Sequence, residues 1–210
     1  DTLDELVEAA ELFATCPVPE GEGVGLLSLS GGQIGLIADL AEDMGLTFPG
    51  FSGAAKRSLE QILPPFSPIA NPLDAWGSGD LEATYPGCVD VVSWEEDVHL
   101  LAVSRGTPDG VAEREVEQSL AVADAAVEAA EETGKPVVLF SNFCAGFQTE
   151  VKRRLDEGGV PYLQGTRETL RAIQAFVDWG TFRRARGRED GMGAPSPPEL
   201  PRWRERLQEV

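Results

Sequence analysis

A chain of 210 residues is long enough for one well-buried domain with extensions and short for two. Its hydrophobic fraction of 42% and charged fraction of 25% are ordinary for a globular protein, which excludes general disorder. The formal net charge of -19 argues against nucleic acid or an anionic membrane as a partner, because either requires a basic surface. Two explanations of the acidity stay open: solubility in a salt-rich cytoplasm, and an acidic docking face.

The cysteines, the histidine and the apolar runs indicate a cytoplasmic protein without a metal site. Cys16, Cys88 and Cys144 are widely spaced, and none belongs to a C-x-x-C pair, which is typical of reduced thiols. One histidine and no His/Cys cluster give no zinc pattern, and no apolar run approaches the roughly 20 residues of a membrane span. The acidic, amphipathic segment 1–12 is the opposite of a signal peptide. The chain begins without methionine, which is typical of a fragment or a processed product.

The first third of the chain predicts a helix, then a strand, a glycine turn and a second helix. Leu3, Leu6, Val7 and Ala10 recur at helical spacing, so residues 2–15 are expected to form an amphipathic helix, and the Pro/Gly-rich residues 17–23 a linker. Residues 24–29 form a mostly apolar run, as a buried parallel strand requires. The break at residues 30–32 is followed by helical spacing that ends near Gly45.

The rest of the chain continues this alternation. Further helices are expected at residues 53–63, 113–133, 151–156 and 166–182, and further strands at 98–103, 137–140 and 160–163. A polar loop is expected at 71–74, whereas the acidic segment 85–97 is unlike a simple connection from a helix to a strand. The fold class predicted is α/β: a doubly wound, mainly parallel, flavodoxin-like sheet. The expected divisions are a helix and linker (1–23), the α/β domain (24–184), and an Arg/Gly/Pro-rich tail with a short terminal helix (185–210).

The first turn from strand to helix is the leading candidate for a binding site. In such sheets ligands bind beyond the carboxyl ends of the strands, where helix N-termini point into a crevice. Gly31 and Gly32 allow backbone N–H groups to approach a ligand, and the helix dipole favours an anion there. Ser30 is expected to cap the helix and to contact a phosphate, with Gln33 beside it. From spacing alone a plain tight turn with a capping serine is the more common case, because the segment is neither a Walker loop nor a G-x-G-x-x-G fingerprint.

Other polar residues are weaker candidates. Asn71 and Asp74 flank a proline in a turn, and at the end of a strand they would orient the crevice through hydrogen bonds. His99 falls inside a predicted strand, where a lone histidine is more often structural than catalytic. Cys144 follows a strand and would reach the crevice, but a free structural thiol is the more common case. No catalytic residue is therefore assigned to this chain.

Four blocks of the sequence, in order, resemble the NDP-forming acyl-CoA synthetases, relatives of succinyl-CoA synthetase. The blocks are "DTLDELVEAAELFATCPVPEGEGVGLLSLSGGQIGLIADLAEDMGL", "LEQILPPFSPIANPLDAWGSGD", "KPVVLFSNF" and "EGGVPYLQGTRETLRAIQAFVDW". The resemblance runs from about residue 2 to residue 184, and the ordered set carries it rather than any one block.

The resemblance implies a role within a larger enzyme. Members of the family join a CoA-binding domain, two flavodoxin-like domains and an ATP-grasp part, and use CoA, ATP and Mg. This chain is similar to the second flavodoxin-like domain. The phosphohistidine belongs to the first, in a Ser-His-Thr-Gly-like stretch that this sequence lacks, so we expect the chain alone to be inactive. By resemblance, Ser30, Gly31, Gly32 and Gln33 would hold inorganic phosphate or the phosphohistidine, and Asn71 and Asp74 match the family's Asn-Pro-x-Asp block.

The partners expected are therefore sister domains or subunits that carry the CoA, phosphohistidine and ATP-grasp sites, with no nucleic acid and no membrane. The carboxylic acid, the choice of ADP or GDP, and the oligomeric state stay open. Two other functions stay open as well. The same string of domains occurs fused to protein lysine acetyltransferases, where it acts as a ligand sensor. A flavin-binding module is suggested by the fold alone, which does not imply flavin.

Overall fold

A computed structural model describes residues 2–76 and 80–189 of the chain. Five parallel strands form one sheet in the order β2-β1-β3-β4-β5, which is the flavodoxin order. The strands are β1 (Val24–Ser28), β2 (Leu73–Asp74), β3 (Leu100–Ser104), β4 (Val137–Ser141) and β5 (Tyr162–Gln164). The helices are α1 (Leu3–Thr15), α2 (Gly31–Met44), α3 (Gly53–Ile62), α4 (Leu81–Ser93), α5 (Glu113–Thr133), α6 (Thr149–Glu157) and α7 (Thr166–Glu189). The predicted fold class is confirmed.

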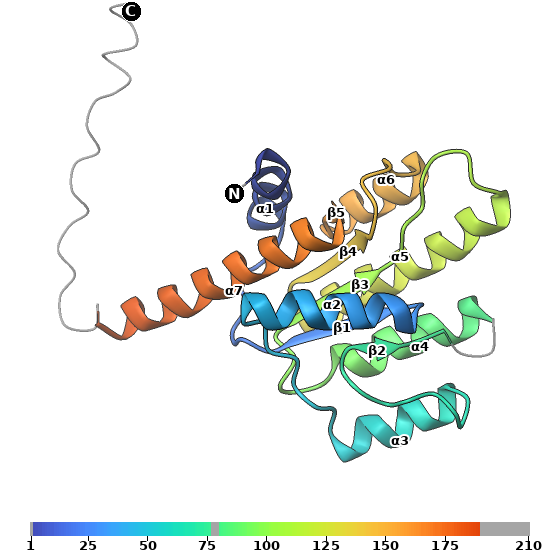
Figure 1. Cartoon of the computed structure of the whole chain (residues 1–210), viewed down its shortest axis with the longest axis horizontal. Helices are drawn as coiled ribbons and strands as arrows, with labels where there is room; N and C mark the ends of the chain where they lie inside the picture. Colours follow the sequence, from blue (N-terminus) through green and yellow to red (C-terminus); the bar gives the residue numbers. More distant parts are fainter. Residues whose placement is uncertain (1, 77–79, 190–210) are drawn as a thin grey trace, which may run out of the picture.

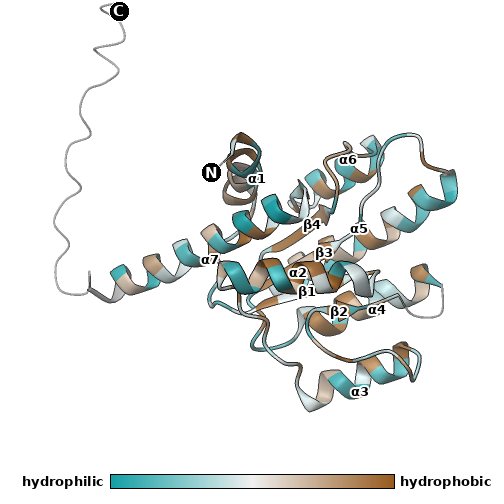
Figure 2. Ribbon diagram, viewed as in Figure 1, coloured by the Kyte–Doolittle hydropathy of each residue, from teal (hydrophilic) through white to brown (hydrophobic). Residues whose placement is uncertain are grey.

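The sheet is buried on both faces because its strands are apolar throughout. All five residues of β1, β3 and β4 are buried. Alternate residues of each strand point to opposite faces. In β1, for example, Leu27 packs with α3, α4 and α5, whereas Leu26 packs with α2 and α7. Helices flank the sheet (Figure 1). Two hydrophobic cores result, one on each face of the sheet. Figure 2 shows the apolar strands at the centre and a largely hydrophilic α6 at the outside.

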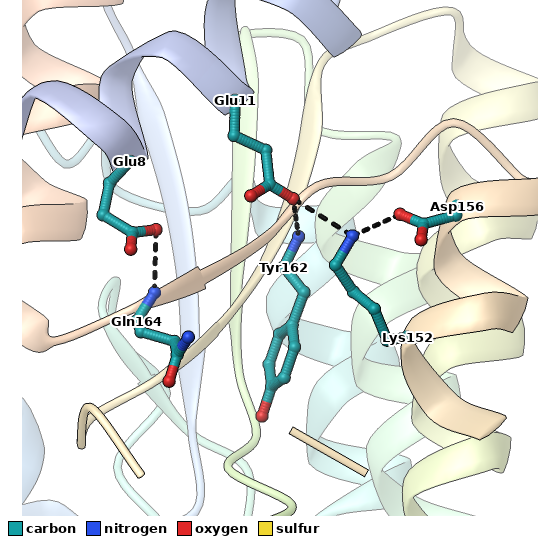
Figure 3. A network of polar contacts seen from close by, with 6 residues as sticks. All are labelled: Glu8, Glu11, Lys152, Asp156, Tyr162 and Gln164. Carbon is teal, nitrogen blue, oxygen red and sulfur yellow. Dashed lines mark hydrogen bonds and ion pairs between the residues drawn. The ribbon is translucent and has the colours of Figure 1, made fainter. Parts of the chain in front are cut away.

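Helix α1 belongs to the same body, although it precedes the first strand by a linker. Its capping box at Thr2 and Glu5 begins the helix, and its buried Leu12 packs against α7. Two carboxylates of α1 accept hydrogen bonds from the outer edge of β5 (Figure 3). Glu8 Oε2 accepts from the N–H of Gln164 at 3.0 Å, and Glu11 Oε1 accepts from the N–H of Tyr162 at 3.3 Å. These bonds occupy N–H groups that an edge strand would otherwise leave unpaired.

A lysine from α6 completes this network. Lys152 Nζ lies 3.3 Å from Glu11 Oε1 and forms a second ion pair with Asp156 on its own helix. Burial raises the pKa of the Glu8 carboxyl, and the nearby Glu11 adds to the rise, while the hydrogen bond from Gln164 opposes it. The network therefore fixes α1 to the sheet edge. It also holds the Glu8 carboxylate in a partly buried place, where the ionised form is less stable than in water.

The structure differs from the predicted elements mainly in four places. Helix α4 occupies Leu81–Ser93, where no helix was predicted, and it overlaps the acidic segment 85–97. Strand β2 is two residues long and includes Asp74, where a loop was expected. Strand β3 begins at Leu100, so His99 precedes the strand rather than lying inside it. Helix α7 continues to Glu189, which is beyond the predicted end at 182, and the expected terminal helix at 202–210 lies outside the described residues.

Among the helices of the described residues, none is long and apolar enough to cross a membrane.

Candidate functional site

A cavity of about 360 Å³ opens where the carboxyl ends of four adjacent strands meet. Loops from β2, β1, β3 and β4 each contribute to it. The lining residues are Leu29, Ser30, Gln33, Trp76, Ser104, Arg105, Gly106, Pro108, Ser141, Asn142, Phe143 and Ala145. The strand order reverses between β1 and β3, and in open α/β sheets this switch point is where ligands bind. A larger hollow of about 540 Å³, between Val18–Glu20 and the end of α7, contains none of the predicted site residues.

The predicted glycine turn lies beside this cavity. Helix α2 begins at Gly31, directly after β1, with Ser30 at the N-cap position. The Ser30 side chain makes no capping hydrogen bond, which differs from the predicted capping role. Among the described residues, no hydrogen bond is made to the N–H groups of Gly31, Gly32 or Gln33. These donors are the unpaired groups of a helix N-terminus, where the dipole favours an anion.

The two glycines of the turn have different surroundings. A Cβ at Gly31 would lie 3.2 Å from Asp74 Oδ2, which is a tight contact that the Asp74 side chain would have to relieve by moving a few tenths of an ångström. A Cβ at Gly32 would have Ser30 Oγ at 3.8 Å as its nearest neighbour and is otherwise open. A ligand can therefore approach the backbone at Gly32.

Two serines and a glutamine fix the base of the turn. Ser28 is fully buried and donates from Oγ to Gln33 Oε1 at 2.7 Å. The same Oγ accepts from the N–H of Ser30 at 3.3 Å. Because Gln33 accepts this bond through its side-chain oxygen, its amide NH2 group is left as a donor that Ser28 does not use. Gln33 thus adds a side-chain donor to the backbone donors of the turn.

The structure separates the two residues of the Asn-Pro-x-Asp block. Asp74 lies next to the turn, and its Oδ1 accepts from the N–H of Trp76 at 3.2 Å. Asn71 does not line the cavity. Its Oδ1 accepts from the N–H of Leu26 at 3.0 Å, and its Nδ2 donates to the carbonyl oxygens of Val24 and Pro49. Asn71 therefore satisfies the backbone beside β1, which is a structural role and differs from the predicted orientation of the crevice.

Neither His99 nor Cys144 lines the cavity, although Cys144 lies between two residues that do, Phe143 and Ala145. His99 precedes β3 at its amino end, so the strand's five residues, about 16 Å, separate it from the carboxyl end. There it borders a separate hollow of about 210 Å³. Cys144 is exposed, and burial together with the acidic Glu168 raises the pKa of its thiol, which opposes thiolate chemistry.

Apart from Ser30 and Gln33, the residues that line the cavity were not predicted as site residues; those with the largest or most polar side chains include Trp76, Ser104, Arg105, Asn142 and Phe143. Each lies at or just beyond the carboxyl end of a strand, which is the signal that would have found them. Asn142 joins the loops rigidly, because its Nδ2 donates to Ser104 Oγ at 2.8 Å and its Oδ1 accepts from Thr166 at 2.9 Å.

Arg105 contributes the positive charge of the cavity. Among the described lining residues it is the one with a formal charge. Its Nε donates to Ser119 Oγ at 2.9 Å, and its Nη2 reaches the Glu115 carbonyl oxygen at 3.5 Å. Burial lowers the pKa of the guanidinium, which remains protonated at any physiological pH.

The site therefore supplies hydrogen-bond donors and one positive charge, which suit an anion. The chain's single histidine is remote, and Ser30 has no histidine beside it as a general base. Among the described residues, no group of three or more His, Cys, Asp or Glu side chains is placed to hold a metal ion. The arrangement can bind and stabilise an anionic group, and the chemistry of bond making would need groups from elsewhere.

Comparison with known proteins gives consistent relatives. The chain is 27% identical over 178 residues to the alpha subunit of an ADP-forming acetate–CoA ligase II of Pyrococcus furiosus, covering 84% of this chain and 38% of that subunit. A segment of 79 residues is 37% identical to a trans-feruloyl-CoA synthase of an unknown prokaryote and covers 38% of this chain and 11% of that protein. No family model matches the chain.

A solved structure shows the same fold. It is a dinucleotide-forming acetyl-coenzyme A synthetase 1 of Candidatus Korarchaeum cryptofilum in complex with phosphate and ADP. It has a TM-score of 0.69 and 20% identity, and the match covers 93% of this chain and 40% of that one. The chain thus spans about two fifths of the acetate–CoA ligase subunit and of this structure.

Proposed function

Because the chain belongs to the family of NDP-forming acyl-CoA synthetases, we propose that it is the domain that stabilises the transferred phosphoryl group in such an enzyme. The observation that carries the proposal is the N-terminus of α2. Its unpaired N–H groups, opened by Gly31 and Gly32, lie beside a cavity at the switch point of the sheet. Fixed donors of this kind stabilise the charge of a phosphoryl group without having to reorganise during the reaction.

The proposed reaction joins a carboxylic acid to CoA at the expense of a nucleoside triphosphate. In the reverse direction, phosphate displaces CoA from the acyl group, the acyl phosphate passes its phosphoryl group to a histidine, and that histidine phosphorylates the nucleoside diphosphate. Each step breaks one bond to phosphorus or to the acyl carbon and forms another. The histidine, the CoA site and the nucleotide and Mg sites would come from sister domains or subunits.

Within this scheme the residues of this chain have one task. The N–H groups of the α2 turn, Ser30 Oγ and the Gln33 amide would contact the phosphoryl oxygens while the histidine holds the phosphorus. The turn is fixed from below by the buried Ser28. Asp74 is the proposed orienting residue, through its hydrogen bond to the loop that follows β2.

The test is transfer of labelled phosphate from ATP, with this chain alone and with the sister domains or subunits present. The proposal expects acid-labile label on the partner that carries the histidine and none on this chain. Label on this chain would assign the transfer to His99 and overturn the proposal. No label on any component would favour a ligand-sensing role instead.

A further inference from the structure

Two large aromatic side chains are exposed at the mouth of the cavity. Trp76 has 56% of its surface exposed and Phe143 69%. Trp76 follows β2 and Phe143 follows β4, so they stand on either side of the loops after β1 and β3. Three strand spacings separate β2 from β4, which places the two loops about 14 Å apart at the backbone. Both rings line the cavity, so they can cover a ligand between them.

The cavity between the rings combines apolar walls with a polar floor. Leu29, Pro108 and Ala145 supply apolar surface, and Ser104, Ser141 and Asn142 supply hydrogen-bonding groups at the strand ends. A volume of about 360 Å³ falls in the range of about 300–1,000 Å³ that small-molecule sites occupy. Its size is sufficient for an organic molecule with one ring, in addition to the anionic group at the helix N-terminus.

The positive charge among the lining residues indicates that the cavity binds a negatively charged ligand. The whole chain carries a formal net charge of -19, yet the one charged residue among the described lining residues is Arg105. The ion pairs of the described residues do not include Arg105, whose hydrogen-bond partners are a hydroxyl and a carbonyl oxygen. The Glu115 carboxylate acts on Arg105 through its charge but forms no ion pair with it. A partly buried guanidinium without a direct ion pair favours an anion that enters beside it.

From these observations we infer that the acyl substrate of this site is an aromatic carboxylic acid. Its ring contacts Trp76 and Phe143, and its carboxylate faces Arg105 and the N-terminus of α2. The orientation follows from the lining, because the apolar rings form the outer ends and the donors lie at the strand ends. The inference rests on the proposed function, which it narrows to one class of acid.

The test measures CoA thioester formation by the full assembly, with benzoate and cinnamate compared with acetate. The specificity ratio, kcat/KM for the aromatic acid divided by that for acetate, is determined for wild type, Trp76→Ala and Phe143→Ala. Removal of one aromatic contact is expected to lower this ratio by about tenfold. The matched controls are Trp94→Ala and Phe66→Ala, because these rings are also exposed, at 58% and 82%, but lie outside the cavity lining.

The outcomes separate the inference from the proposed function. A wild-type ratio above one that falls in the two cavity variants and not in the two controls supports the inference. A ratio below one, or equal losses in cavity and control variants, overturns it. Loss of association with the sister domains in Trp76→Ala, measured by size-exclusion chromatography, overturns it too, because the rings would then be a docking surface.

Labelling by ATP is measured on the same proteins. Normal phosphoryl transfer with no preference for aromatic acids leaves the proposed function standing while the inference fails. Absence of phosphoryl transfer with every acid refutes the proposed function itself.

Discussion

Replacement of Gly32 by aspartate puts a negative charge at the proposed phosphate site without crowding it. The nearest atom to a Cβ at this position is Ser30 Oγ at 3.8 Å, so the new side chain has room. A carboxylate about 5 Å from a phosphoryl charge repels it by about 3 kcal/mol at an effective dielectric constant of about 20. A barrier raised by that amount slows phosphoryl transfer about 100-fold.

The same change is expected to preserve the fold. A negative charge in the first turn of a helix is stabilising by about 0.3–1 kcal/mol, and replacement of a helical glycine adds to this. Gly32→Asp should therefore keep or slightly raise the free energy of unfolding while phosphoryl transfer falls. Gly32→Asn is the matched control, since it has the same shape without the charge.

The assay is acid-labile labelling of the assembled enzyme from ATP, followed over time, with thermal unfolding of each variant measured in parallel. A large loss in the aspartate variant and a small loss in the asparagine variant is the expected pattern. Equal rates in the two variants would refute the electrostatic reasoning, because charge is the main difference between them.

Three further predictions concern other residues. Ser30→Ala should leave the free energy of unfolding unchanged, because Ser30 makes no cap bond, and should slow phosphoryl transfer. Ser52→Ala removes a cap on α3, so it should lower the free energy of unfolding in urea by about 1 kcal/mol without slowing transfer. Glu8→Gln should raise the melting temperature at neutral pH, because burial raises the pKa of Glu8 and its ionised form is held at a cost. The stability that Glu8 contributes in the wild type falls as the pH rises from its pKa in the unfolded chain through its higher pKa in the folded protein. The difference in melting temperature between the two proteins should therefore vanish in acid. A difference that stays constant with pH would contradict this prediction. His99→Ala should leave labelling of the assembled enzyme unchanged, and abolished labelling in a folded variant would reassign the phosphoryl acceptor.

The alternation of strands and helices was predictable because burial on both faces leaves an unmistakable pattern. The strands at Val24, Leu100 and Val137 are continuous apolar runs, which only a sheet covered on both sides requires. Each run is followed by a turn and a helical period, so the parallel, doubly wound arrangement followed from the order of elements alone.

Helix α4 was missed because Pro86 lies within it. A proline in a helix interior removes one hydrogen bond and is normally read as a break. The helical signal was nevertheless present, since Asp80 accepts from the N–H of Ala83 as a cap. Tyr85 and the later apolar residues of α4 also recur at helical spacing, and their burial against the sheet outweighs the lost hydrogen bond.

The sequence could indicate where a candidate site lies, but only some of the residues that form it. The turn at Gly31 and Gly32 could be found because its residues are contiguous in the sequence. Trp76, Arg105 and Phe143 could not be connected with it, since they come from three other loops that only the strand order brings together. The hydrogen bonds of Asn71 to the backbone of Val24, Leu26 and Pro49 could not be predicted either, because these residues are far from Asn71 in the sequence.

The most direct test of the proposed phosphate site is titration of the ¹⁵N-labelled chain with inorganic phosphate, followed by NMR. If the α2 turn binds phosphate, we expect saturable shifts centred on the amides of Ser30, Gly31, Gly32 and Gln33, and their loss in Gly32→Asp but not in Gly32→Asn. Shifts centred instead on the hollow beside His99 and Lys135, or no saturable shift at the α2 turn, would contradict it.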